Sequence, residues 1–334
     1  VFMRIAIVKL SALGDIVHAM IVLQFIKKFN SEILIDWIVE KSYKDLLESH
    51  SDINKVHVVN FRQSKEKKSL LALIEQLKML RKLEAYDFVI DMQGLIKSAV
   101  ISKLIPSKQT LGFDKFSTRE SIASIFYSKT LNFAYHNNII ERNTALIEFA
   151  LGISISKNDI QEKLSFLQPR FQKLDLKISS TKNNVILIPG ASHLSKCYPA
   201  EKLAELTTLL DANFIVVWGN DSEKIMANKV KNLSPAVTVC NKLSINSLII
   251  LISKVDLVIG PDTGPTHISW AMNIPSITLF GSTPGYRNSY QTHINRIIES
   301  KTKVDPYKID KNDYSVSDID IQEILNISLE LLKD

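Results

Sequence analysis

The chain has 334 residues, 46% of them hydrophobic and 23% charged, with a formal net charge of +6 at pH 7. This composition excludes disordered and fibrous proteins, and the length predicts two domains of about 150 residues each. Two cysteines, Cys197 and Cys240, are too few for a disulfide framework or a cysteine metal site. The apolar runs stop well short of the ~20 residues of a membrane span, and no signal-peptide pattern is complete, so we expect a cytoplasmic protein.

Short apolar strands alternate with amphipathic helices along the chain. The first set of predicted strands covers 4–9, 33–39, 55–59 and 86–92, with helices near 15–28, 43–49, 66–84 and 95–104. The pattern restarts with strands at 184–189, 214–219, 237–240, 256–260 and 276–281, and helices near 199–211, 221–231, 244–253 and 264–272. This alternation predicts an α/β protein with two doubly wound domains facing a central cleft, joined by the polar segment 172–184.

The first strand-to-helix turn carries a carboxylate where a helix begins. In "KLSALGDIVHAM", residues 9–20, Asp15 follows Gly14 soon after the first strand. The turn has neither G-x-G-x-x-G nor G-K-[ST], so the dinucleotide and P-loop fingerprints are absent. Capping of the helix explains Asp15, but a carboxylate at the carboxyl end of a first parallel strand also faces the expected ligand site. The residues support both a structural and a catalytic interpretation.

The positive charge is concentrated between Asn60 and Arg142, where there are fourteen Lys and Arg but only eight Asp and Glu. A basic surface of this kind attracts phosphate-rich partners, including an anionic membrane surface or a phosphorylated lipid. Nucleic acid is disfavoured, because no stacking motif of aromatic residues and glycine accompanies the charges. For any one lysine, a solvated surface position is the simpler explanation.

A second turn, "IGPDTGPTHISWAM" at 259–272, leads from a strand into a helix. Gly264 permits close backbone approach, Pro265 suits a first helical position, and the amides at a helix start bind anions such as a diphosphate. An ordinary capped helix explains a single polar residue, such as Asp262, but not four small or polar residues in one turn. We therefore favour a functional site, and the four residues are Thr263, Gly264, Thr266 and His267.

Two further turns offer polar groups after strands. "GASHLSK" at 190–196 brings Ser192, His193, Ser195 and Lys196 between a strand and a helix. Hydroxyls with one lysine can hold phosphate oxygens, although a solvated loop is a competing interpretation. In "WGNDSE", Glu223 follows a strand, where a carboxylate can accept hydrogen bonds from ribose hydroxyls.

These segments together resemble the ADP-heptose:lipopolysaccharide heptosyltransferase family, glycosyltransferase family 9. The resemblance covers nearly the whole chain, in "RIAIVKLSALGDIVHAM", "DWIVE", "VIDMQGLIKSA", "TRESIASIFY", "ERNT", the Lys196 loop, "WGNDSE", "NKLS" and "DTGPTHISWAMNIPSITLFGSTPG". Within the family, "DMQGLIKSA" and "TRE" are more similar to heptosyltransferase I than to heptosyltransferase II. The resemblance implies a glycosyltransferase of GT-B architecture, with an acceptor-binding domain at 1–175 and an ADP-heptose-binding domain at 180–317. It also implies that the C-terminal helix, 318–334, packs back on the N-terminal domain.

The resemblance also assigns roles to individual residues. The general base falls on Asp15, and Lys196 is expected to stabilise the charge on the departing ADP. The donor-binding residues fall on Ser192, Lys196, Glu223, Lys242, Leu243, Asp262, Thr263, Gly264 and His267. The expected acceptor-binding residues are Ser11, Gly14 and Gln93, together with Arg62, Arg119 and Arg142, which we expect from the basic region to meet the anionic acceptor. The chain departs from the family pattern at Ala191, where members often carry a hydroxyl, and His193 stands nearby.

The implied reaction transfers heptose from ADP-L-glycero-D-manno-heptose to Kdo of Kdo-lipid A, with inversion of the anomeric centre, as the first heptose of the lipopolysaccharide inner core. No cofactor or metal is expected, because a lysine and a helix terminus supply the positive charge. The resemblance and the basic region imply a monomer that binds no nucleic acid and contacts the cytoplasmic face of the inner membrane peripherally.

Three alternatives remain. An NAD-dependent oxidoreductase, or another nucleotide-binding Rossmann-type enzyme, has the same fold class, but the glycine fingerprint is missing. A basic nucleic-acid-binding module explains the net charge but not the turns at Lys196 and Asp262. A sister heptosyltransferase of type II uses the same donor and adds a later heptose to a different acceptor.

Overall fold

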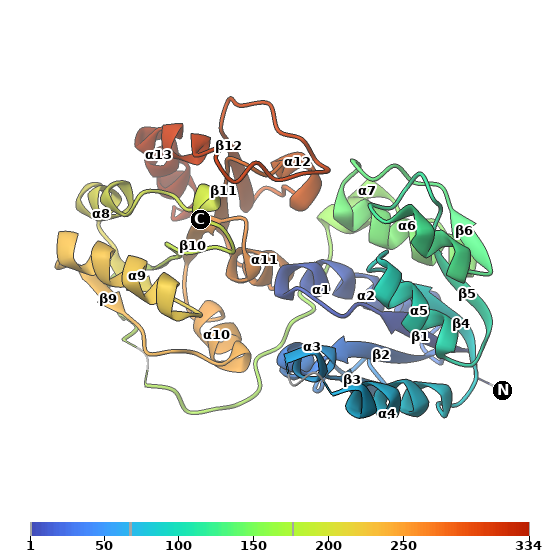
Figure 1. The fold of residues 1–334 in the computed structure, drawn as a ribbon. Coiled ribbons are helices and arrows are strands. Elements are labelled where there is room, and N and C mark those ends of the chain that lie inside the picture. The colour runs from blue at the N-terminus through green and yellow to red at the C-terminus, as the bar shows by residue number, and fades with distance from the viewer. Residues whose placement is uncertain (1, 67–68, 176, 334) are drawn as a thin grey trace. The chain divides into compact units, whose positions relative to one another are not determined.

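Each half of the chain folds around its own parallel sheet (Figure 1). The computed structural model describes residues 2–66, 69–175 and 177–333. The chain divides into two units, Val1–Lys163 and Leu164–Asp334, which we name unit 1 and unit 2. The predicted α/β class, with two Rossmann-like sheets, is confirmed.

Unit 1 contains a six-stranded sheet in the order β3-β2-β1-β4-β5-β6, in which all neighbours pair in parallel. Its strands are β1 (Arg4–Val8), β2 (Leu34–Glu40), β3 (Lys55–Val59), β4 (Tyr86–Asp91), β5 (Ser107–Phe113) and β6 (Lys129–Leu131). Its α-helices are α1 (Leu13–Met20), α2 (Val22–Phe29), α3 (Phe61–Glu66), α4 (Leu70–Arg81), α5 (Ile96–Leu104), α6 (Ile139–Leu151) and α7 (Lys157–Gln161). Two 3₁₀ helices complete it, η1 (Lys41–Leu46) and η2 (Ser121–Phe126).

Unit 2 contains a second parallel sheet, in the order β12-β11-β10-β7-β8-β9. Its strands are β7 (Asn184–Leu187), β8 (Asn213–Val216), β9 (Val237–Val239), β10 (Leu257–Pro261), β11 (Ser276–Phe280) and β12 (Asn295–Glu299). Its helices are η3 (Leu194–Lys196), α8 (Ala200–Leu209), α9 (Asp221–Leu233), α10 (Ile245–Ile252), α11 (Gly264–Ala271), α12 (Gly285–Asn288), η4 (Ser315–Asp318) and α13 (Ile321–Leu331). Across both units, none of the described helices has the length and apolar character that a membrane crossing requires.

The two sheets have the same strand order, which fixes where ligands bind. Counted along the chain within each unit, the strands lie in the order 3-2-1-4-5-6. The chain reverses direction across the sheet between β1 and β4 in unit 1, and between β7 and β10 in unit 2. Ligands of doubly wound sheets bind beyond the carboxyl ends of the strands at this switch point. The segments that follow these four strands are therefore the expected binding edges.

Alternating apolar side chains explain why helices cover both faces of the unit 1 sheet. Ala6 and Val8 of β1 belong to a buried cluster with Leu80 of α4. Ile5 and Ile7 alternate with them along the strand, so they point to the opposite face, and both are fully buried. A strand buried on both faces reads as a continuous apolar run, which is why the sequence predicts β1 clearly.

The C-terminal helix corrects one expectation. Ile324 and Leu331 of α13 lie in the core cluster of unit 2, together with Leu203 of α8 and Ile277 of β11. The expectation that residues 318–334 pack on the N-terminal domain is therefore wrong for this chain. The apolar face of α13 is used to cover the sheet of unit 2 instead.

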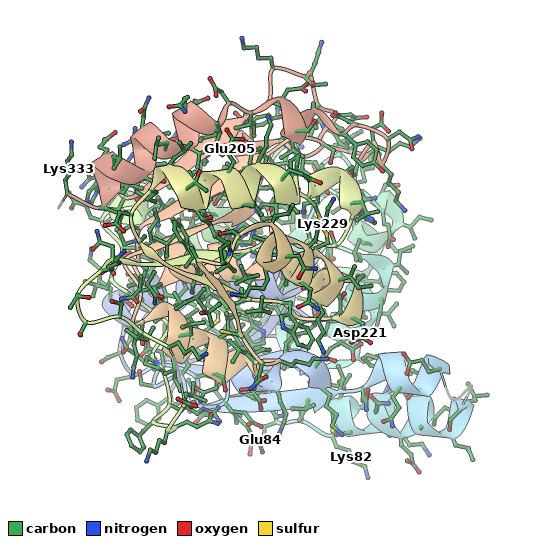
Figure 2. All side chains as sticks on the ribbon, turned by 90° about the vertical axis from the view of Figure 1, so that its left-hand side faces the viewer. Lys82, Glu84, Glu205, Asp221, Lys229 and Lys333 are labelled. Carbon is green, nitrogen blue, oxygen red and sulfur yellow. The ribbon has the colours of Figure 1, made fainter. Side chains whose placement is uncertain are left out.

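Helices α8 and α9 form part of the outer layer of unit 2. An ion pair of 2.6 Å between Glu201 of α8 and Lys229 of α9 joins them. Figure 2 shows α9 with Asp221 at its beginning and Lys229 further along it. The residues at the beginning of α9 directly follow β8, so α9 presents its first turn at the binding edge of the sheet.

The boundary between the units lies before the predicted linker. The backbone N–H of Phe166 donates to Ala271 O at 3.1 Å, and its ring meets Trp270 edge to face at 5.6 Å. Residues directly after 163 therefore pack on unit 2, although they lack a helix or strand. These residues form a loop, so the predicted alternation of strands and helices could not indicate that they pack on unit 2.

Burial of Lys163 makes the stability of unit 1 depend on pH. Its side chain is 4% exposed, and burial lowers the pKa of its amine from 10.5 to about 7. Between these values the unfolded chain binds one more proton than the folded chain, so the free energy of unfolding rises with pH. In the wild type, Lys163 should make the free energy of unfolding rise by up to about 1.4 kcal/mol per pH unit in this range. We expect Lys163→Met to lack this contribution.

Urea unfolding of the wild type and Lys163→Met, at several pH values between about 6 and 10, tests this expectation. The difference between the two proteins should change with pH, with the variant gaining most below pH 7. Lys103→Met, at an exposed position in α5, is the control and should follow the wild type. Parallel curves for wild type and Lys163→Met would show that Lys163 keeps an ordinary pKa.

Candidate functional site

The binding edge of unit 1 carries Asp15 on the first turn of α1. Asp15 Oδ2 accepts a hydrogen bond of 3.2 Å from the backbone N–H of Ala12, which is the N-cap of the helix. Asp15 is partly exposed, and within the described part of the chain its second carboxylate oxygen has no partner. The carboxylate therefore caps the helix with one oxygen and keeps the other available for a ligand.

Gln93 connects the two loops at this edge. Its Oε1 accepts from the backbone N–H of Leu10 at 3.1 Å and of Ser11 at 3.3 Å. Ser11 and Gly14 are partly exposed in the same loop as Asp15. The structure thus brings the predicted residues Ser11, Gly14, Asp15 and Gln93 to one edge, at the carboxyl ends of β1 and β4.

Arg142 does not lie on an open surface and corrects a second expectation. The residue is 3% exposed in α6, and its guanidinium donates to the carbonyls of Phe133, Ala134 and Ser117. It also lies 3.9 Å from the centre of the Phe113 ring. A guanidinium committed to three carbonyls holds loops of unit 1 together, so Arg142 is not available to an anionic acceptor.

The other two predicted arginines have different outcomes. Arg119 is exposed between β5 and η2. Arg62 lies in α3, but its side chain is outside what the structure describes. Arg119 is therefore the predicted arginine that the structure places in contact with solvent.

The binding edge of unit 2 is built around the buried carboxylate of Asp262, directly after β10. Lys196 Nζ lies 2.9 Å from Asp262 Oδ2, and His267 Nε2 lies 3.0 Å from Oδ1. Thr283 Oγ1 and Asn288 Nδ2 donate to Oδ2 at 3.0 and 3.2 Å. Four side chains from the segments that follow β7, β10 and β11 thus converge on one acid.

These partners keep Asp262 ionised although it is buried. Burial raises the pKa of its carboxyl, but the positive charge of Lys196 and the hydrogen bond of His267 outweigh burial and hold the pKa well below its ordinary value. The carboxylate in turn fixes the Lys196 ammonium at the carboxyl edge of the sheet. Lys196 is itself buried, and a cation held in this position can pair with an anion that binds at this edge.

The beginning of α11 adds backbone N–H groups to this edge. Thr263 is the N-cap of the helix, and its N–H donates to Thr266 Oγ1 at 3.4 Å. Thr266 Oγ1 in turn donates to Thr263 O at 2.7 Å. Gly264 and Thr263 are partly exposed at this end, where the amides of a helix start favour negative charge.

The loop after β7 places its two serines differently. Ser192 is exposed, whereas Ser195 is buried and lies 3.1 Å, Oγ to Oγ, from Ser282. His193 is partly exposed in the same loop. Ser195 therefore anchors the loop that carries Lys196, and Ser192 presents its hydroxyl to solvent.

Glu223 packs directly over Gly190, in the loop that follows β7. A Cβ on Gly190 would lie 2.3 Å from Glu223 Cγ, so only glycine leaves room for this side chain. Glu223 Oε2 accepts from the N–H of Gly219 at 2.7 Å, and Oε1 accepts from Asn220 Nδ2 at 2.7 Å. Sequence reasoning predicted Glu223 but missed the glycine that makes its position possible.

Lys242 and Leu243 follow β9 in the loop before α10. Lys242 is exposed and Leu243 is partly buried. Neighbouring Cys240 accepts a hydrogen bond of 2.8 Å at its carbonyl from Trp218 Nε1, which ties this loop to the end of β8. The structure places the pair at the same carboxyl edge as the beginning of α9.

Sequence reasoning also missed Thr283 and Asn288, which complete the shell of Asp262. The available signal for Thr283 was the position of "STPG", residues 282–285, directly after the predicted strand 276–281, because a loop at that place reaches the same edge. Among residues 2–66, 69–175 and 177–333, no three His, Cys, Asp or Glu side chains come together as a metal-binding group.

Comparisons with known proteins cover nearly the whole chain. A family model described as glycosyltransferase family 9 (heptosyltransferase) matches residues 72–309. Lipopolysaccharide heptosyltransferase 1 of Campylobacter coli is 38% identical, and the match covers 99% of this chain and 100% of the relative. The protein of the same name from Escherichia coli K12 is 28% identical, over 86% of this chain and 91% of the relative. The solved structure of E. coli heptosyltransferase WaaC with ADP shares the fold, with a TM-score of 0.79, 22% identity and coverage of 98% of this chain and 100% of that chain.

Proposed function

This chain belongs to glycosyltransferase family 9, the heptosyltransferases, and we propose that it transfers the first heptose of the lipopolysaccharide inner core to Kdo of Kdo-lipid A. The donor in this proposal is ADP-L-glycero-D-manno-heptose. The observation that carries the choice of acceptor is the 38% identity, over 99% of this chain, to a relative named lipopolysaccharide heptosyltransferase 1.

The geometry of unit 2 supports a nucleotide diphosphate donor. Lys196, the hydroxyl of Ser192 and the beginning of α11 offer cationic and hydrogen-bonding groups at one edge, where a diphosphate is favoured. Glu223, in the first turn of α9 after the neighbouring strand β8, is placed to accept hydrogen bonds from ribose hydroxyls. The cationic and backbone groups thus suit the charged diphosphate of ADP, and the Glu223 carboxylate suits its polar nucleoside.

The geometry of unit 1 supports Asp15 as the general base. In the proposed step, a Kdo hydroxyl oxygen forms a bond to the anomeric carbon of heptose while the bond from that carbon to the ADP oxygen breaks. The hydroxyl proton moves to Asp15, and the bonding electron pair leaves with ADP. Attack on the face opposite the leaving group inverts the anomeric centre. The charge that grows on ADP is stabilised by Lys196 and the amides of α11.

The groups around Asp262 support a transfer in which the protein supplies the positive charge. Both oxygens of Asp262 are occupied by protein donors, and Lys196 is the cation beside them. We propose that this lysine, rather than a divalent cation held by Asp262, neutralises the diphosphate. Activity in the presence of a chelator is the expected result.

Release of ADP from ADP-heptose, with and without Kdo-lipid A, tests the proposed function. We expect release that depends on Kdo-lipid A and that is absent with a Kdo-lipid A already carrying its first heptose. Release only with the heptosylated acceptor would favour the heptosyltransferase II alternative. Release with neither acceptor would contradict both.

The position of Glu223 over Gly190 predicts that a larger residue at position 190 weakens donor binding. Gly190→Ala should displace Glu223, because the new Cβ and Glu223 Cγ cannot stand 2.3 Å apart. We expect the KM for ADP-heptose to rise by about tenfold or more in this variant and in Glu223→Ala, since charge-assisted hydrogen bonds are lost.

Steady-state kinetics with saturating acceptor measure this change. Gly152→Ala is the matched control: a Cβ there meets open space, but the positive φ of +66° makes the substitution strained. It should lower the melting temperature and leave the donor KM unchanged. An unchanged donor KM in Gly190→Ala would remove Glu223 from the donor site.

We propose that unit 1 contacts the inner membrane through η2 and the preceding loop, which we name the η2 surface. Ile122 and Ile125, three residues apart in a 3₁₀ helix, project from the same side and are 57% and 73% exposed. Ala123 and Tyr127 face the core instead. Further exposed residues of the η2 surface are Lys115, Phe116 and Arg119 of the preceding loop, and Lys129 of β6, after η2, is exposed as well. Apolar side chains flanked by cations suit an anionic lipid surface.

Vesicle sedimentation tests the η2 surface. Ile122→Ser with Ile125→Ser should weaken binding to vesicles that contain anionic lipid, and Arg119→Ser should weaken it at low salt more than at high salt. Ile225→Ser is the control, because Ile225 is 71% exposed on α9 of unit 2. Equal vesicle binding by all variants would exclude this surface.

A further inference from the structure

The two loops at the edge of unit 1 are tied together by three hydrogen bonds. Gln93 Oε1 accepts from the N–H groups of Leu10 and Ser11, at 3.1 and 3.3 Å. In the opposite direction, Lys9 Nζ donates to Met92 O at 3.0 Å. These bonds join the loop after β4 to the loop after β1, which leads within a few residues to Asp15.

A buried acid fixes the loop that carries Gln93. Asp91 is fully buried at the end of β4, and its Oδ1 accepts from the N–H of Gln93 at 2.8 Å and of Gly94 at 3.1 Å. Its Oδ2 accepts from Ser98 Oγ at 2.8 Å and from Tyr127 Oη at 2.7 Å. Four donors from four residues therefore hold one carboxylate, and the loop cannot shift without breaking some of these bonds.

Tyr127 reaches Asp91 because Gly112 of β5 has no side chain in the space that the ring occupies. A Cβ on Gly112 would lie 2.4 Å from Tyr127 Cε2, so the ring occupies the space that a larger side chain would fill. Ala99 of α5 and Ala123 of η2 pack around the same ring. The hydrogen-bond chain thus runs from a ring wedged beside the sheet, through Asp91, to the backbone of the loop.

We propose that Gln93 is a positioning residue for Asp15: its carboxamide oxygen holds the β1–α1 loop in the place set by Asp91 and Tyr127. This inference rests on the proposed function of Asp15 and differs from the expected role of Gln93 as an acceptor-binding residue. Its oxygen is already committed to two amides within the protein. A displacement of about 1 Å at a reacting group can cost a hundredfold in rate, so such a support matters for turnover.

Two substitutions separate positioning from direct contact with the acceptor. Gln93→Met keeps the length of the side chain and removes the acceptor oxygen, whereas Gln93→Glu keeps an oxygen that can accept from Leu10 and Ser11 but removes the NH₂ group. Gln161→Met, at an exposed position of α7, is the matched control. Kinetic constants and backbone hydrogen exchange of residues 9–12 are measured for each variant.

For Gln93→Met we expect exchange of the Leu10 and Ser11 amides to quicken by about tenfold or more, and kcat to fall by about ten- to hundredfold, with the donor KM within about twofold of wild type. Gln93→Glu should restore slow exchange and most of kcat. Unchanged exchange in Gln93→Met, or faster exchange with an unchanged kcat, would overturn the proposal. An equally inactive Gln93→Glu with a raised KM for Kdo-lipid A would also overturn it, because the NH₂ group would then bind the acceptor.

The exchange measurement also distinguishes this inference from the proposed function. It needs no turnover, so the support of the loop can be judged even if Asp15 is not the base. If Asp15→Asn kept full activity while Gln93→Met loosened residues 9–12, the role of Asp15 would fail and the hydrogen-bond chain would stand. If exchange were unchanged while Asp15→Asn was inactive, the role of Asp15 would stand and Gln93 would lose its positioning role.

Discussion

Asp15→Asn should lower kcat by about a hundred- to ten-thousandfold while the protein stays folded and binds ADP-heptose normally. The amide keeps an oxygen that can accept from the Ala12 N–H, as Asp15 does at 3.2 Å, so the cap of α1 survives. It cannot take a proton from the acceptor hydroxyl. The loss should therefore appear in kcat and not in the donor KM or the melting temperature.

A second capping acid in the same unit provides the control for Asp15. Asp159 occupies the third position of α7 and accepts from the N–H of Ser156 at 2.9 Å, so its place in the helix is the same as that of Asp15 in α1. Asp159→Asn should leave kcat unchanged. If Asp15→Asn were as active and as stable as Asp159→Asn, Asp15 would be a cap alone.

Lys196→Ala should lower kcat by about a hundredfold or more, because a preorganised charge at the leaving group is lost. Donor affinity should fall less, since the beginning of α11 and Glu223 still bind ADP. The measurement is steady-state kinetics with both substrates varied. Lys229→Ala, which removes an exposed lysine of α9 paired with Glu201, is the control and should keep normal kinetics.

Loss of Lys196 also leaves the buried Asp262 without its cation, which can destabilise unit 2. The pair of Lys196→Ala with Asp262→Asn separates the two effects. The double variant should regain part of the stability lost in Lys196→Ala and regain none of the turnover. Recovery of turnover together with stability would mean that Lys196 acts through folding and not on the diphosphate.

The strands that lie at the centre of each sheet were predictable because burial on both faces requires apolar residues in succession. "RIAIV" and "LVIG" satisfy this rule, and β1 and β10 lie where it predicts. The omitted strands β5, β6 and β12 lie toward the edges, where fewer apolar residues are needed. "SKQTLGF" of β5 begins with four residues that a periodicity of apolar side chains does not mark.

Helix α6 was omitted for a different reason. Its middle contains "ERNT", and Arg142, Asn143 and Thr144 are all buried there. A sequence rule that places polar residues on the surface fails at Arg142, because carbonyls from two loops accept hydrogen bonds from its buried guanidinium. The same failure produced the wrong acceptor-binding role for Arg142.

Within the candidate sites, the sequence located the turns but not their pairings. Asp262 and Lys196 were each predicted from a turn after a strand, and their contact depends on the position of β7 beside β10. Thr283 lies in the loop after β11, and Asn288 is the last residue of α12, which follows that loop. Such convergence is set by sheet order and loop conformation, which no local pattern of residues encodes.

A competition between two acceptors, followed by mass spectrometry of the products, shows directly which acceptor the enzyme uses. The enzyme is incubated with ADP-heptose and equal amounts of Kdo-lipid A and Kdo-lipid A that already carries one heptose, and the products are resolved by mass spectrometry. We expect Kdo-lipid A to gain the mass of one heptose residue and the heptosylated acceptor to stay unchanged. A gain of heptose by the second acceptor alone would contradict it.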